Sequence, residues 1–379
     1  MSTPKLFQPL KVGDIELKHR IVLAPLTRFR ADSKHVPSDL MVEYYAQRAS
    51  TPGTLLITEA TFITERAGGY AHVPALETED QVACWRKVVD AVHAKGSYIY
   101  AQLWALGRSA DTKYLAKRGF DFVSASDVPV NNGPKPRPLT VIEIKEYVGW
   151  YTQAAINAVQ KAGFDGVEVH SSNGHLLHQF IEDHSNLRTN EYGGSIENRA
   201  RFPLEVVDSI SKAIGPTKTA IRLSPFETFQ QMGMKDPYPT YTYVVSQLIE
   251  RHPDLAYIHA NHAIERSRGG PNAIDFAKII EGKSLDFIRK IWAPRPFISC
   301  GFYTPESALK AADTEGDLIS FGRYFISNPD LPYRIKNKIP LTPWNSSTFY
   351  VPESPIGYID YPFAKSDAQN ETVEYVEEE

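Results

Sequence analysis

The sequence is poor in cysteine, in long apolar runs and in net charge. Its only two cysteines, Cys84 and Cys300, are too few for the disulfide framework of a secreted domain. Residues 1–11 lack the apolar core of a signal peptide, and no apolar run approaches the length of a membrane span. A formal net charge of -4 gives no electrostatic reason to expect nucleic acid or a membrane as a partner. We therefore expect a cytoplasmic protein.

The chain also lacks a Gly-x-Gly-x-x-Gly motif after its first predicted strand, which argues against a doubly wound dinucleotide-binding sheet. Eight short, nearly continuous apolar runs alternate with longer segments of helical pattern, as expected of parallel strands covered on both faces. This alternation predicts an α/β protein with a single (β/α)8, or TIM, barrel. The predicted strands are residues 20–25, 54–59, 97–104, 166–170, 219–225, 255–260, 295–301 and 318–325.

Helix-start signals support this alternation. Thr140 and Glu143 form a capping-box pattern before an apolar segment. Thr304 precedes a proline at a first helical position, and Thr78 is placed to cap the segment that follows it. We therefore expect helices to begin directly after each of these threonines.

Segments outside the barrel have predictable places. Residues 6–20 read as an N-terminal hairpin that would plug the N-terminal end of the barrel. Residues 105–140 and 226–240 are long loops that follow strands, so they should cross the C-terminal, catalytic face as lids. We expect one TIM-barrel domain over residues 1–363 and an acidic, disordered tail over 364–379.

A histidine and an asparagine close the fourth predicted strand. His170 and Asn173 stand where strands of a TIM barrel end and functional loops begin. Two donors that converge on one oxygen could polarise a carbonyl group or hold a phenolate. On spacing alone, we favour the other interpretation, in which the His and the Asn merely satisfy loop backbone groups.

Further motifs accompany this pair. Residues 191–202 read Glu-Tyr-Gly-Gly-Ser-Ile-Glu-Asn-Arg-Ala-Arg-Phe. With motifs at other strand ends, this block resembles the signature of the Old Yellow Enzymes, which are FMN-dependent ene-reductases. The resemblance runs in order from about residue 5 to about residue 363. The other matching motifs lie at residues 24–28, 102–104, 222–225, 321–330, 348–350 and 357–362.

The resemblance implies a site at the mouth of the barrel. Arg222 would lie beside the flavin atoms that gather negative charge on reduction, and Gln102 suits a pyrimidine-like edge. Gly301, Gly322 and Arg323 would form the phosphate site. Catalytic roles would fall to His170, Asn173, His175 and Thr27. The implied FMN contacts are Pro25, Thr27, Ala60, Gln102, His170, Arg222, Gly301, Gly322, Arg323, Phe349 and Tyr350, and the implied substrate contacts are His170, Asn173, Trp104 and His175.

Three positions depart from the family pattern. Ala60 stands where many members have glycine, and Phe302 replaces a polar residue beside the phosphate site. His175 stands where the family usually has the tyrosine that protonates the substrate. With an ordinary pKa of about 6.5, histidine would be partly protonated near neutrality, so the proton could come from His175 or from water.

The resemblance implies that NADPH reduces FMN, which then delivers hydride from N5 to the activated C=C bond of an enal or enone. The protein would be a monomer or a homodimer. An alternative is a flavin-dependent isomerase or a biosynthetic reductase of a secondary-metabolite pathway. A metal-dependent hydrolase built on His170, His175, His178 and His184 is disfavoured, because no paired carboxylates or second histidine motif support it. A pure binding module has little support.

Overall fold

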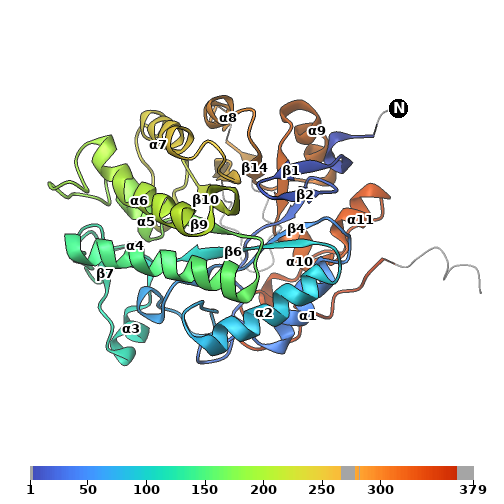
Figure 1. The fold of residues 1–379 in the computed structure, drawn as a ribbon, viewed down its shortest axis with the longest axis horizontal. Coiled ribbons are helices and arrows are strands. Elements are labelled where there is room, and N and C mark those ends of the chain that lie inside the picture. Colours follow the sequence, from blue (N-terminus) through green and yellow to red (C-terminus); the bar gives the residue numbers. More distant parts are fainter. Residues whose placement is uncertain (1–2, 266–277, 281, 365–379) are drawn as a thin grey trace, which may run out of the picture.

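The computed structural model describes residues 3–265, 278–280 and 282–364. Eight parallel strands close into a barrel, because β15 pairs with β3 at one seam and β4 pairs with β6 at the other (Figure 1). The predicted TIM barrel is therefore confirmed. The barrel strands are β3 (Ile21–Leu23), β4 (Leu55–Ile57), β6 (Tyr98–Trp104), β9 (Gly166–Ser171), β10 (Thr219–Leu223), β11 (Tyr257–Asn261), β14 (Phe297–Cys300) and β15 (Leu318–Phe321).

The eighth strand is shorter than predicted. The apolar run 318–325 was expected to be one strand, but the strand ends at Phe321 and helix α10 (Arg323–Ser327) follows. The carbonyl of Gly322 accepts hydrogen bonds from the amides of Phe325 and Ile326, at 2.9 and 3.1 Å. A continuous apolar run does not distinguish a buried strand from a buried helix, and this is why the pattern overran the boundary.

Helices surround the strands on the outside of the barrel (Figure 1). The capping box at Thr140 is present, since its hydroxyl accepts from the Glu143 amide at 3.2 Å and Glu143 Oε2 accepts from the Thr140 amide at 2.7 Å. Thr78 and Thr304 cap the two other expected helices. The main outer helices are α1 (Asp39–Arg48), α2 (Glu79–His93), α4 (Val141–Ile156), α6 (Ile196–Ile214), α7 (Tyr238–Arg251), α8 (Asp286–Trp292), α9 (Pro305–Glu315) and α11 (Leu331–Lys336).

The N-terminal hairpin plugs the barrel, as expected. Strands β1 (Leu10–Val12) and β2 (Ile15–Leu17) pair antiparallel. The buried side chains of Val12, Ile15 and Leu17 pack in one cluster with residues at the N-terminal ends of the barrel strands. Because this end is filled by side chains, a ligand must enter from the opposite, C-terminal end.

Two long loops cover that opposite end. Residues 105–140 contain the short helix α3 (Thr112–Arg118) and the short strands β7 (Val123–Ser124) and β8 (Arg137–Pro138). Arg108 joins this loop to the second one, because its Nη2 donates to the carbonyls of Gln230 and Gln231 at 3.0 and 3.2 Å. The two predicted lids therefore form one cover.

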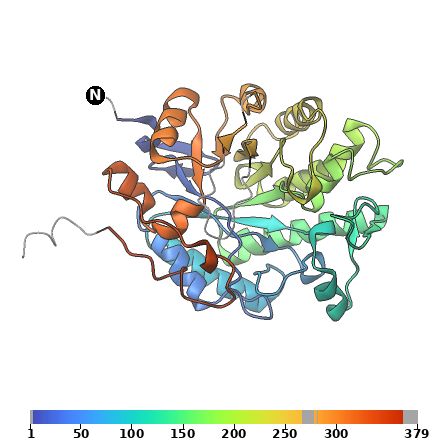
Figure 2. The ribbon, with the colours of Figure 1, turned by 180° about the vertical axis from the view of Figure 1, so that it is seen from behind.

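The C-terminal segment returns to the barrel and passes beside α1 (Figure 2). The rings of Tyr44 and Tyr358 stack there with centroids 4.2 Å apart. The predicted acidic tail lies outside the described residues from residue 365 on. Among the residues that are described, no helix combines the length and the apolar character needed to cross a bilayer.

Candidate active site

A cavity of about 470 Å³ opens at the C-terminal ends of the barrel strands. Every site residue predicted from the sequence lines this cavity except Gly301 and Gly322, which lie at the ends of neighbouring elements. Residues that are far apart in the sequence thus meet at one place. The predicted residues that line it are Pro25, Thr27, Ala60, Gln102, Trp104, His170, Asn173, His175, Arg222, Arg323, Phe349 and Tyr350.

Parallel pairing sets the first polar row of the site. Arg222 on β10 stands in register with His170 on β9 and with His259 on β11. His170 is buried, and its Nδ1 lies 2.9 Å from the Ser172 hydroxyl. Burial, followed by the positive charges of its neighbours, holds the pKa of His170 well below the ordinary value. The imidazole therefore meets the cavity as a neutral group.

A chain of hydrogen bonds fixes the orientation of the Asn173 side-chain amide. A guanidinium only donates, so the atom of Asn261 that lies 2.9 Å from Arg222 Nη2 must be its oxygen. Asn261 therefore donates from its nitrogen to Asn173 Oδ1, at 3.0 Å. With its oxygen engaged, Asn173 is left with its NH2 group, one hydrogen of which reaches toward Glu227 Oε2 at 3.4 Å. The residue is held at φ 57, in the left-handed region.

A second network orients Gln102. Its Nε2 donates to Glu168 Oε1 at 2.7 Å, and Glu168 Oε2 lies 2.9 Å from His259 Nδ1. Burial alone would raise the pKa of Glu168, but the facing His259 and Arg222 and the Gln102 hydrogen bond outweigh it and lower that pKa. Because a carboxylate only accepts, Gln102 keeps its oxygen and one N–H for the cavity. This is the donor–acceptor pattern expected of a residue on a pyrimidine-like edge.

His175 stands against the aromatic wall of the cavity. Its ring meets Trp104 edge to face at 4.7 Å and His170 at 4.8 Å. Burial, then the nearby His178 and Arg222, lowers the pKa of His175 to about 3. The expectation that this imidazole is partly protonated near neutrality is therefore wrong, because it assumed an exposed ring.

The predicted phosphate end is built from two glycines and an arginine. Gly301 has φ 158, and a Cβ there would come within 2.8 Å of His262 Cβ. Gly322 directly precedes Arg323, the first residue of α10. The guanidinium of Arg323 lies 5.1 Å from the centroid of the Phe302 ring. The unusual Phe302 thus supports the arginine by a cation–π contact.

The cavity fits FMN. Arg222 Nε is buried and has no hydrogen-bond partner among the described residues. Buried donors are normally paired, so an acceptor such as the ring edge of a flavin would satisfy this one. Gln102 offers a donor and an acceptor, and Pro25 and Ala60 contribute apolar side chains to the wall. Phe349 is buried at this wall while Tyr350 is largely exposed.

Other residues of the cavity were not predicted. Arg28 donates to the carbonyls of Phe349 and Gly357, at 3.1 and 2.7 Å, and so fastens the C-terminal segment that carries Phe349. Arg28 is the last residue of the family-like motif at residues 24–28, so the motif indicated that it lies near the site. Nothing in the sequence indicated its hydrogen-bond partners. The remaining unpredicted lining residues are Leu26, Phe229, Ile326, Trp344 and Ser346.

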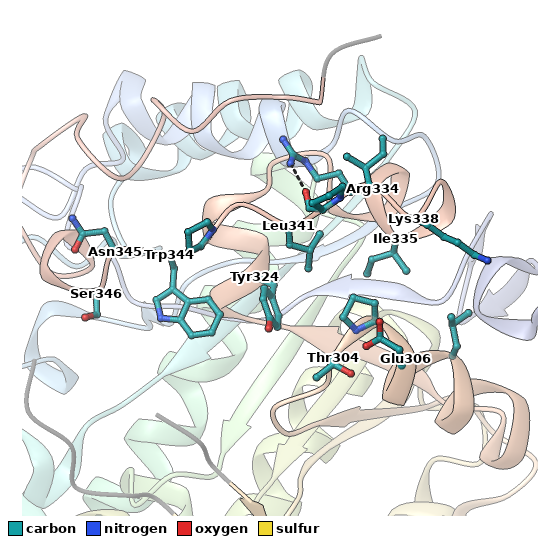
Figure 3. Close-up of a pocket in the computed structure, with 15 residues that line it drawn as sticks. Thr304, Glu306, Tyr324, Arg334, Ile335, Lys338, Leu341, Trp344, Asn345 and Ser346 are labelled. Atoms are coloured by element: carbon teal, nitrogen blue, oxygen red, sulfur yellow. Dashed lines mark hydrogen bonds between the residues drawn. The ribbon is translucent and has the colours of Figure 1, made fainter. Parts of the chain in front are cut away.

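A larger cavity of about 1090 Å³ lies beside the first and shares Trp344 and Ser346 with it (Figure 3). Its other walls are mainly apolar, with Tyr324 facing Trp344 and Arg334 donating to the carbonyl of Pro340 at 3.1 Å. None of the predicted site residues lines it. The smaller cavity is therefore the candidate active site, because the convergent polar groups lie there and not in the larger one.

The histidines of the metal-site alternative are held by other partners. His178 Nε2 lies 2.8 Å from the Tyr241 hydroxyl and 3.2 Å from Glu182 Oε1, and its Nδ1 accepts from the Gly174 amide. Among residues 3–265, 278–280 and 282–364, no three His, Cys, Asp or Glu side chains are grouped so that they could hold a metal ion.

Comparison with known proteins agrees with this geometry. Residues 5–342 match the model of the NADH:flavin oxidoreductase / NADH oxidase family. Chanoclavine-I aldehyde reductase fgaOx3 of Penicillium roqueforti (strain FM164) is 50% identical over 367 residues, which cover 95% of this chain and 96% of that protein. A probable inactive reductase, easA, of Epichloe festucae var. lolii is 46% identical over 96% of this chain and 97% of that protein.

The same holds for solved structures. The Old Yellow Enzyme from Pichia sp. AKU4542 superposes with a TM-score of 0.87 at 40% identity, covering 96% of this chain and 94% of that one. The chain therefore belongs to the NADH:flavin oxidoreductase / NADH oxidase family, as an Old Yellow Enzyme type of oxidoreductase with FMN as its cofactor and a nicotinamide as its reductant.

Proposed function

We propose that this protein uses NADPH to reduce the activated C=C bond of an α,β-unsaturated aldehyde or ketone. The observation that carries the proposal is the fixed polarity of Asn173 beside His170. The Arg222–Asn261–Asn173 chain engages the oxygen of Asn173, and Glu227 accepts from its NH2 group, so the second hydrogen of that group is the one left to donate in the cavity that His170 also lines. Two neutral donors at one place suit an oxygen that gains negative charge.

The pair acts on the carbonyl oxygen of the substrate. When His170 and Asn173 donate to that oxygen, electron density moves toward it and the β-carbon becomes electrophilic. FMN, when bound, supplies the hydride that this carbon accepts. Pro25, Thr27 and Gln102 would hold the flavin, and Arg323 with Gly301 and Gly322 its phosphate end.

We assign the proton that reaches the α-carbon to water. A buried imidazole whose pKa lies near 3 is neutral at neutral pH, and its single N–H is a much weaker acid than an imidazolium. The cover made by residues 105–140 and 226–240, tied by Arg108, would set which substrates enter.

An aldehyde is the substrate we would test first, since the relative at 50% identity is named as an aldehyde reductase. Purified yellow protein would be mixed anaerobically with NADPH, and then with a panel of enals and cyclic enones. We expect stoichiometric NADPH consumption and a saturated product. Flavin that NADPH does not reduce would contradict the proposal. A rearranged product formed without net NADPH consumption would favour the isomerase alternative instead.

A further inference from the structure

The hydrogen bonds of Ser109 determine where His175 carries its proton. The Ser109 hydroxyl lies 2.7 Å from the carbonyl oxygen of Leu106 and 2.9 Å from His175 Nδ1. A carbonyl oxygen has no proton, so the single proton of the hydroxyl must point at Leu106. The hydroxyl oxygen can then only accept from His175, which places a proton on Nδ1.

The other ring nitrogen is consequently bare. A neutral imidazole has one N–H, so a proton on Nδ1 leaves Nε2 as an acceptor. Burial keeps the ring neutral, as the low pKa of His175 indicates. Within the part of the chain that the structure describes, Nε2 has no hydrogen-bond partner, and the ring lines the cavity.

The acceptor stands next to the donors. The rings of His175 and His170 have centroids 4.8 Å apart. A ligand whose carbonyl oxygen is held by His170 and Asn173 therefore places the groups nearest that carbonyl, above all those on the α-carbon, beside Nε2. Arg222 is close enough to act on the charge of His175. A cationic ammonium group would be disfavoured there, whereas a hydroxyl group would not.

We propose that His175 Nε2 is a hydrogen-bond acceptor that selects unsaturated carbonyl substrates with a hydroxyl group on or next to the α-carbon, and that Ser109 is the positioning residue that sets this polarity. The placement of the carbonyl rests on the proposed function. The polarity of His175 does not, because it follows from Ser109 and Leu106 alone.

The polarity can be measured directly. Holoenzyme labelled with ¹⁵N-histidine would be studied by long-range ¹H–¹⁵N NMR, with His175→Phe used to assign the resonances. We expect His175 to show a protonated Nδ1 and an unprotonated Nε2 in wild type and in Ser109→Thr, which keeps the hydroxyl. In Ser109→Ala this tautomer should lose its dominance. A wild-type ring protonated on Nε2 would overturn the proposal.

Selectivity needs a matched pair of ligands. A cyclic enone with a hydroxymethyl group on its α-carbon would be compared with the same enone bearing an ethyl group, by titration of the oxidised holoenzyme and by turnover. We compare the ratio of the affinity for the hydroxymethyl enone to the affinity for the ethyl enone. In wild type and in Ser109→Thr this ratio should be about 2- to 12-fold higher than in His175→Phe, which corresponds to the contribution of one neutral hydrogen bond. Ser109→Ala should lose part of that preference.

An equal preference in wild type and His175→Phe would overturn the selectivity. If both enones bind in the expected ratio and neither is reduced, the proposed function fails while the assignment of His175 stands. The two failures are therefore distinguishable.

Discussion

The neutral state of His175 makes a prediction about the pH dependence of catalysis. With a pKa of about 3, only about one ring in 10⁴ is protonated at pH 7. Oxidation of the reduced flavin by an enal should therefore show no break between pH 5.5 and 8 that arises from this residue. Anaerobic stopped-flow mixing of reduced enzyme with an enal, at a series of pH values, measures that rate.

His175→Phe is the matched control, because it keeps a ring in the same wall and removes both nitrogens. The substitution is expected to change the rate by a factor that is the same at every pH in this window. Flavin reduction by NADPH serves as an internal reference. A wild-type rate that falls as pH rises through about 6.5, with a fall that His175→Phe abolishes, would refute the reasoning and restore His175 as the acid.

The same depressed pKa predicts how stability varies with pH, and three further predictions accompany it. His175 binds a proton more weakly when folded, so its contribution to stability is complete above about pH 6.5 and declines as pH falls toward 3. Between pH 7.5 and pH 5 the free energy of unfolding of the wild type should fall by about 2 kcal/mol more than that of His175→Phe. Denaturant unfolding at the two pH values measures both changes, and equal changes would contradict the lowered pKa of His175. In Asn261→Asp the new carboxylate can accept from Arg222 but cannot donate to Asn173. The Asn173 amide should then flip and donate its NH2 group to that carboxylate, which leaves its oxygen for the cavity. Phenolate affinity should therefore fall by roughly 10- to 150-fold. Asn261→Ala should lose less, and an Asn261→Asp variant with wild-type phenolate affinity would show that the chain has no directing role. Arg323→Ala should weaken FMN binding by roughly 10- to 150-fold in reconstitution of the apoprotein, and undiminished retention would remove Arg323 from the phosphate site. Heat-denatured protein should release FMN and not FAD, since no adenosine-binding motif was found, and chromatography of the released flavin decides this.

The barrel was predictable because each of its strands is a short apolar run buried on both faces. The hairpin plug and the helix caps followed from local signals such as Thr140 with Glu143. The end of the last strand was not predictable, because apolar residues recur beyond Gly322 and Arg323, at Tyr324, Phe325 and Ile326.

The residues of the site were predictable from motifs, but their polarity was not. Asn261 meets Asn173 across 88 positions of sequence, and Ser109 meets His175 across 66. These contacts exist only once the barrel closes and its loops fold over the mouth. The burial of His175 likewise arises only when the wall of the cavity is assembled. Burial is the largest cause of the lowered pKa of His175, and the sequence around the residue does not indicate it.

The central claim is that His170 and Asn173 together hold an oxygen that carries negative charge. Titration of the oxidised FMN enzyme with a phenol, followed by its long-wavelength charge-transfer band, tests that claim most directly. The double variant His170→Ala/Asn173→Ala should bind the phenolate more weakly by on the order of 3 to 6 kcal/mol, since each hydrogen bond to a charged oxygen contributes about 1.5 to 3 kcal/mol. Unchanged phenolate affinity and an unchanged band in the double variant would contradict the account.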